Sequence, residues 1–344
     1  MRRIVDHNPE RGAVSVIVAL LLASLLGFVA IAVDVGVIYS ERAQLQNGAD
    51  ASAIALAQKC ARDSTGTQCS TTSTLAGDLA NNNALDGMSK VYSIQLDKAA
   101  RKVSVTTAAK EPGGAENSVT LFFANVLGIP TKEVGARGSA VWGSARAGRT
   151  AFPLAFSVCQ VKDKIDGELQ RLQDHGKNTN ADCNYGPSGA AVEGGFGWLV
   201  QDPGKCGGSI DLAVSEGGSD PGNNAPANCS DTLNKWVSEI TAGRKVTVLL
   251  PIFNKVTGTG NGAVYSLVAF AAFEVTGWKF SGDSVAPNTF QNRAGSAPGV
   301  TLANECRGEC RGIIGKFVKY TSLDDGYTLG PVDEYGATIA RPVL

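Results

Sequence analysis

Histidine is nearly missing from this sequence, which has only His7 and His175 among its 344 residues. No CxxC pair accompanies them, so a metal site built from cysteine and histidine is not expected. His175 lies in a polar turn, where a solvated loop histidine is a better interpretation than a general base. The G-x-S-x-G and HExxH signatures are absent as well. We therefore predict no catalytic, cofactor-binding or metal-binding residues, and no enzymatic activity.

An excess of charge of either sign is also missing. Lysine and arginine number 31 against 32 aspartates and glutamates, which gives a formal net charge of −1. This balance argues against nucleic acid as a partner, because such proteins carry a basic surplus. Apolar residues nonetheless make up 43% of the chain, enough for a folded protein, and the 41 glycines favour turns and strands over a helical bundle.

Charged residues are absent from Ala13 to Val33, a run of 21 residues diluted only by two serines and one glycine. As a helix this run spans about 30 Å, the thickness of the hydrocarbon core of a bilayer. A buried helix of a soluble protein usually has a polar face, and this run has none. We predict that residues 13–33 form a single transmembrane helix in the cell membrane, with membrane lipid as its first partner.

The flanks of the run indicate its orientation. Arg2, Arg3 and Arg11 precede it, and arginines on a short tail favour keeping that tail in the cytoplasm. Residues 1–12 are therefore expected to be a cytoplasmic tail. Everything from Asp34 onward is expected on the extracytoplasmic side.

Two other interpretations of this N-terminus remain open. A cleaved signal peptide usually has a shorter apolar region that ends at a small-x-small site, whereas this run continues into residues 35–39 without one. Processing after Gly12, as in prepilins, would fit the glycine before the run, but Ile17 stands where their fifth mature residue is usually glutamate. We favour an uncleaved anchor.

Strong helix formers dominate residues 34–62, where the helix is expected to continue outward as a membrane-proximal stalk. Ala49, Ala53 and Ala57 recur every four residues on one face of this segment. A stripe of small residues lets another helix approach closely. A docking face for the protein's own domain is the favoured interpretation of the stripe, although the sequence leaves both open.

Residues 63–145 are predicted to form a small α+β, pilin-like domain. Its expected elements are a helix at 74–82, a hairpin from segments 91–96 and 102–106, a short apolar helix at 121–127 and a strand at 134–142.

Residues 143–148 are small and glycine-containing, and they are predicted to be a linker. Residues 150–344 are then expected to form a larger β-rich domain, with strands at 246–253, 263–275 and 313–320. Within it, residues 202–229 are rich in glycine, asparagine and proline and are predicted to be a long loop.

All eight cysteines follow the apolar run, as expected if the downstream chain meets an oxidising compartment in which thiols pair. They are Cys60, Cys69, Cys159, Cys183, Cys206, Cys229, Cys306 and Cys310. Connectivity is not fixed by sequence. Short loops favour Cys60–Cys69, Cys206–Cys229 and Cys306–Cys310, which leaves Cys159 with Cys183.

Three motifs between residues 10 and 60 occur together. They are ERGAV before the apolar run, AVDVG at its end and ERAQLQNGADA beyond it. In combination they resemble the TadE/TadG-like proteins of tight-adherence (Flp) pilus assembly, which have an apolar anchor, a VD-x-G step and a QLQN-x-AD-A tract. Segments 152–155, 194–199 and 270–277 also resemble the C-terminal part of TadG-like proteins.

The resemblance implies a membrane-anchored accessory protein of a pilus or secretion apparatus, without enzymatic activity, whose partners are other proteins of that apparatus. Some larger TadG-like proteins carry an adhesive von Willebrand A domain with a metal-binding D-x-S-x-S motif. Residues 50–54 match only two of its three defined positions and lie in the stalk, so adhesion through such a site is not expected.

A different class of function is also considered. A cell-surface module that binds envelope polysaccharide would explain the glycine- and asparagine-rich loop at 202–229 and the tryptophans, although tryptophans are more often core residues. A third possibility, an extracytoplasmic hydrolase, would depend on His175 as its base.

Overall fold

The computed structural model describes residues 10–161, 165, 167–173, 196–214, 216–218, 226–258, 262–282, 285–321, 326–335 and 337–343. The chain divides into two compact units. Unit 1 comprises Met1–Val141 with Arg341–Leu344, and unit 2 comprises Trp142–Ala340. An apolar N-terminal helix followed by a β-rich region with disulfides was expected from the sequence, and the structure has this arrangement.

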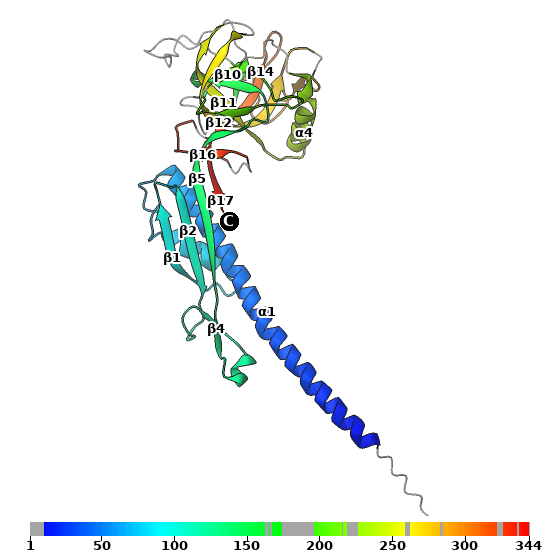
Figure 1. Cartoon of the computed structure of the whole chain (residues 1–344). Coiled ribbons are helices and arrows are strands. Elements are labelled where there is room, and N and C mark those ends of the chain that lie inside the picture. Colours follow the sequence, from blue (N-terminus) through cyan, green and yellow to red (C-terminus); the bar gives the residue numbers. More distant parts are fainter. Residues whose placement is uncertain are drawn as a thin grey trace, which may run out of the picture. The chain divides into compact units, whose positions relative to one another are not determined.

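Unit 1 is built on one long helix, α1 (Glu10–Arg62). Between Val14 and Val33 its side chains are exposed except at Ala30. From Leu45 to Ala61 the same helix packs against the rest of the unit. In Figure 1 the dark-blue end of α1 extends beyond the other elements of its unit, whereas the lighter half lies beside β1 and β2.

Small residues let α1 pack closely against α2 (Thr74–Asn82), which has the bounds expected from the sequence. A Cβ atom on Gly48 would lie 3.1 Å from Ala80 Cα, so the two helix backbones approach each other closely here. The Ser52 hydroxyl is fully buried and donates a hydrogen bond to the Ala76 carbonyl at 2.9 Å.

The other side of α1 rests on a sheet made by β1 (Ser89–Asp97), β2 (Lys102–Ala109) and the first half of β5 (Gly135–Arg149). The expected hairpin between β1 and β2 is present and antiparallel. Thr107 Oγ1 donates to the Leu45 carbonyl at 2.9 Å.

Unit 2 contains most of the remaining strands. Its main sheet has the order β7-β14-β12-β11-β6-β8, with β10 and β13 also paired to β12. The bounds are β6 (Leu154–Ser157), β7 (Gln170–Gln173), β8 (Phe196–Trp198), β10 (Glu216–Gly218), β11 (Val246–Thr257), β12 (Val264–Lys279), β13 (Thr289–Phe290) and β14 (Gly312–Val318). The expected strands at 246–253, 263–275 and 313–320 lie within or overlap β11, β12 and β14.

An aromatic cluster fills the core beside this sheet. The Phe152 ring lies 5.7 Å from Trp198, 5.1 Å from Trp236 and 5.6 Å from Phe280. The helix α4 (Ser230–Thr241) contributes Leu233 and Trp236 to this core, which also includes a short helix, α3 (Val158–Val161). Aromatic packing of this kind accounts for much of the stability of a core.

The expectation of a linker at residues 143–148 is wrong, because these residues belong to strand β5. They pair with β9 (Ser209–Asp211) and β16 (Thr328–Gly330). A Cβ atom on Gly143 would lie 2.3 Å from the Gly330 carbonyl oxygen. The small residues therefore serve close packing within a strand rather than chain flexibility. Two further short strands, β15 (Tyr320–Thr321) and β17 (Thr338–Pro342), pair in parallel.

Three disulfides join Cys60 to Cys69, Cys206 to Cys229 and Cys306 to Cys310, the pairs that loop length favours. Cys159 is also disulfide-bonded. Its expected partner, Cys183, lies outside the described residues.

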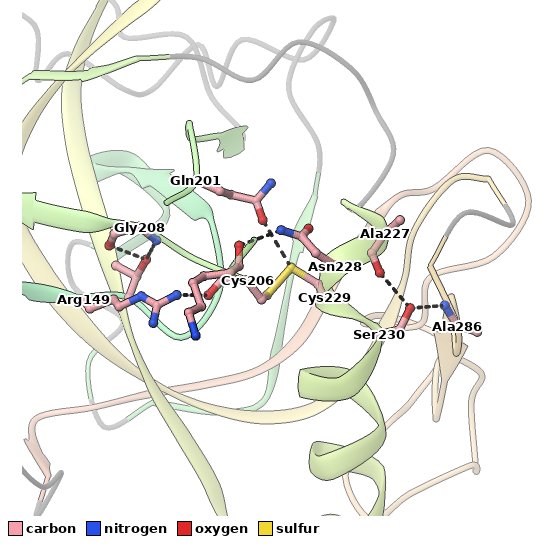
Figure 2. Close-up of a disulfide and its surroundings, with 11 residues drawn as sticks. Arg149, Gln201, Cys206, Gly208, Ala227, Asn228, Cys229, Ser230 and Ala286 are labelled. Atoms are coloured by element: carbon pink, nitrogen blue, oxygen red, sulfur yellow. Dashed lines mark hydrogen bonds between the residues drawn. A yellow bond between two sulfur atoms is a disulfide. The ribbon is translucent and has the colours of Figure 1, made fainter. Parts of the chain in front are cut away.

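Hydrogen bonds surround the Cys206–Cys229 disulfide (Figure 2). Arg149 donates to the Cys206 carbonyl at 3.4 Å, and the Asn228 amide donates to the Lys205 carbonyl at 2.7 Å. The disulfide joins the start of the expected loop to η3 (Ala227–Cys229), directly before α4. Residues 202–229 are thus fastened at both ends, and β9 and β10 lie within them.

Candidate functional site

The feature of unit 1 with the plainest functional meaning is the first half of α1. Within the described residues, one helix is long and apolar enough to cross a membrane, and it is this one. Polar side chains within this apolar half can satisfy their hydrogen bonds inside the helix. The Ser24 hydroxyl, for example, donates to the Leu20 carbonyl at 2.9 Å, which satisfies it without water.

Asp34 is the first charged residue after the apolar run, and its side chain is only 6% exposed. Its carboxylate accepts hydrogen bonds from three successive backbone N–H groups, those of Phe122 at 2.9 Å, Phe123 at 3.1 Å and Ala124 at 2.6 Å. Charge-assisted hydrogen bonds of this kind are strong and make the burial of a carboxylate tolerable.

The donors belong to a loop between β3 (Ser118–Thr120) and β4 (Thr131–Glu133). We call residues 121–130 the apolar loop. Its one regular element is a 3₁₀ turn, η1 (Ala124–Leu127), where the sequence predicts a longer helix from residue 121. The expected helix is reduced to these four residues, and the N–H groups of residues 122–124 bond to Asp34.

Sequence reasoning missed the role of Asp34. The contact joins residues 88 apart in the chain, so no local periodicity reveals it. The only available signal was the position of a single carboxylate directly after the apolar run.

The stripe of Ala49, Ala53 and Ala57 is fully buried within unit 1. Residues expected as a separate stalk, 34–62, and as an α+β domain, 63–145, thus contribute to one core. Of the two interpretations left open, the structure shows these alanines packed inside the protein's own unit.

Glu41 lies about two helical turns beyond Asp34 in α1. Burial raises the pKa of this carboxyl, and the negative charges of Asp86 and Glu111 raise it further. Like charges and desolvation both disfavour the ionised form, so this position is electrostatically costly at neutral pH.

Unit 2 offers less chemistry among its described residues. All four tryptophans of the chain, Trp142, Trp198, Trp236 and Trp278, are buried and none forms an exposed platform. This removes the aromatic support for polysaccharide binding. His175 and residues 191–195 lie outside the described residues, as does His7.

One cleft of about 700 Å³ is lined by residues of β7, β12 and β14, including Arg171, Glu274 and Lys316. Two of its charged side chains pair within the protein, since Glu274 lies 3.8 Å from Lys316 and also 3.2 Å from Lys245. In the described ranges, no group of three or more metal-ligating side chains is assembled. Asp50, in the incomplete D-x-S-x-S stretch, accepts hydrogen bonds from Gln46, and Ser52 is used in helix packing.

Taken together, the site defines a class: proteins with one N-terminal helix able to span a membrane, continuous with a folded α+β unit and followed by a disulfide-containing β-rich region. Residues 12–58 match the Tad family model, described as "Putative Flp pilus-assembly TadE/G-like". The resemblance drawn from the motifs of residues 10–60 is thereby confirmed. No curated protein and no solved structure matches the chain.

The matched region runs along α1 from Gly12 to Gln58, and it includes the apolar run, Asp34 and the alanine stripe. The description of this family model relates residues 12–58 to the assembly of Flp pili.

Proposed function

We propose that this chain is a membrane-anchored structural or assembly protein of a tight-adherence (Flp-type) pilus or a related secretion apparatus. The observation that carries the proposal is the coincidence of the Tad match with α1. One continuous helix joins an exposed apolar half to a half packed in a folded core, so a force or displacement on either part is transmitted to the other.

The protein crosses the cell membrane once, with residues 1–12 in the cytoplasm and the chain from Asp34 onward outside. Arg2, Arg3 and Arg11 support this orientation through the positive-inside rule. The disulfides support it independently, because structural disulfides persist in oxidising compartments. The partners are membrane lipid and other proteins of the apparatus, and no catalytic step is assigned to the chain.

A genetic experiment tests this function. Deleting the gene should abolish or strongly reduce surface pili, and the wild-type gene should restore them. A Leu22→Arg/Leu25→Arg variant should fail to restore pili, since each arginine near the centre of a transmembrane helix costs about 2.5–3.5 kcal/mol on insertion scales. The matched control is Leu85→Arg, at an 88% exposed position outside the helix, which should restore them.

Normal pilus assembly and adhesion in the deletion strain would contradict the proposal. A second, independent experiment is cross-linking in intact cells, followed by identification of the linked proteins. It distinguishes a role in the pilus from another role in the envelope. Recovery of pilus proteins supports the proposal, whereas recovery of the chain from the cytosol with free thiols would overturn it.

A further inference from the structure

The apolar loop presents an unusual surface. Phe122, Val126 and Leu127 are 77%, 86% and 80% exposed, and Phe123 and Ile129 are exposed as well. Residues 121–130 contain no charged side chain. Elsewhere in the described ranges outside α1, exposed large apolar residues occur singly along the sequence. A cluster of this kind marks a surface that is covered by something apolar.

The loop is ordered by its own hydrogen bonds. Leu121 N donates to the Pro130 carbonyl at 2.8 Å, and Ile129 N donates to the Ala124 carbonyl at 3.1 Å. With the N–H groups of residues 122–124 bonded to Asp34 and no N–H on Pro130, few backbone donors of the loop need water. Such a loop can leave water at low cost.

Its position relative to the anchor is fixed. Asp34 follows the last residue of the apolar run, and it holds the start of the loop through three backbone hydrogen bonds. Ile38 and Ala124 also pack at the edge of the same small core. If Ala13–Val33 fills the hydrocarbon core, Asp34 lies at its boundary, and the loop lies there too. Figure 1 shows this segment, beyond β4, reaching along the side of α1.

We infer that the apolar loop inserts its side chains into the boundary of the lipid bilayer next to Asp34, as a second membrane contact beside α1. The inference rests on the membrane anchoring in the proposed function, and it holds for either orientation of the helix. Full burial of a Phe, Leu or Val side chain is worth about 1.5–3 kcal/mol, and partial burial at the interface a fraction of that. Two contacts fix the tilt and rotation of the helix, which one contact does not.

Lipid is the occupant that the observations favour. The exposed side chains are continuous with an apolar helix surface that itself requires lipid, and the carboxylate at the junction is already satisfied by N–H groups. The surface carries no charge, and Asn125 is the one polar side chain of the loop, so little in it would specify a protein partner. Packing against a transmembrane helix of another protein is the alternative outcome of the test.

The experiment is site-specific photo-cross-linking in intact cells. The photoreactive residue p-benzoylphenylalanine replaces Phe122 or Leu127 in the full chain, one at a time. A negative control places it at Leu85, which is 88% exposed. The backbone N–H of Leu85 bonds to Gln44, about 15 Å further along α1 than Asp34. A positive control places it at Leu22 within the apolar run. Adducts are identified by mass spectrometry.

We expect phospholipid adducts at Phe122, Leu127 and Leu22, and at least tenfold fewer at Leu85. Lipid adducts at Leu22 without any at Phe122 or Leu127 would overturn the inference while leaving the anchor intact. Protein adducts alone at Phe122 and Leu127 would overturn it too and identify the true partner. Absence of lipid adducts at Leu22 would overturn the anchor itself, and the loop inference with it.

Discussion

At the scale of single residues, two carboxylates that follow the apolar run of α1 have contrasting surroundings. Asp34 is buried with three donors, so its negative charge is compensated. Glu41 is partly buried and faces the like charges of Asp86 and Glu111. The Asp34 carboxylate therefore holds the loop at residues 122–124 in place, whereas the ionised Glu41 carboxylate destabilises the folded state.

We predict that Glu41→Gln stabilises the protein at neutral pH. The pKa of Glu41 is raised on folding, so the folded state binds a proton more tightly than the unfolded state, and stability falls as pH rises through the raised pKa. The advantage of the variant should be full at pH 7 and should disappear below about pH 4, near the ordinary glutamate pKa. Thermal unfolding of the detergent-solubilised chain across pH 4–8 measures it.

Glu133→Gln is the control, because this exposed carboxylate lies in the same unit. Its effect should stay within about 0.5 kcal/mol at every pH, as for most surface substitutions. A Glu41→Gln variant that is less stable than the wild type at pH 7 would show that the glutamate has a favourable partner instead.

At the scale of elements, the sequence predicted correctly those helices and strands whose formation depends on neighbouring residues in the chain. The helix at 74–82 and the hairpin of β1 and β2 follow from side-chain periodicity, and both formed as expected. The prediction of a linker at residues 143–148 was wrong because small residues are typical both of a linker and of a tightly packed strand. Gly148 shows the difference, since a Cβ there would lie 2.3 Å from the Tyr327 ring.

Helix packing in unit 1 gives a prediction at this scale. Ala53 is 0% exposed, and Ala53→Leu would force a larger side chain into the packed core of the unit. Overpacking of this kind costs about 1–3 kcal/mol. Hydrogen exchange of the α2 amides, measured by mass spectrometry on the full chain in lipid nanodiscs, should quicken by roughly 5- to 150-fold.

The matched control is Ala43→Leu, the same change at an exposed position of α1. Exchange of α2 in this variant should equal that of the wild type. Unchanged exchange in Ala53→Leu would mean that the alanine face is not held against the core in solution, and that it is free to receive a partner helix.

At the scale of the whole molecule, the sequence predicted the long apolar helix well, because a run of 21 uncharged residues is visible without a structure. It could not predict the Asp34 contact with the apolar loop, which depends on the folded arrangement of unit 1. The proposed orientation of the helix rests on the charged residues that flank the apolar run rather than on the fold, and it is testable by itself.

We predict that only the C-terminal side of the helix is reached from outside the cell. A cysteine introduced by Leu302→Cys, at a 77% exposed position, should react with a membrane-impermeant maleimide on intact cells. Asp6→Cys, in the tail, should react only after permeabilisation. The cysteines at 60, 69, 206, 229, 306 and 310 should stay silent because they are in disulfides.

The cause of this orientation is tested by the same assay. Replacing Arg2, Arg3 and Arg11 together with glutamate removes the positive charge that retains the tail, so labelling of Leu302→Cys on intact cells should fall and labelling of Asp6→Cys should rise. Labelling of Asp6→Cys on intact cells in the otherwise unchanged chain would reverse the proposed topology. The disulfides would then need another explanation, because the units that contain them would face a reducing compartment.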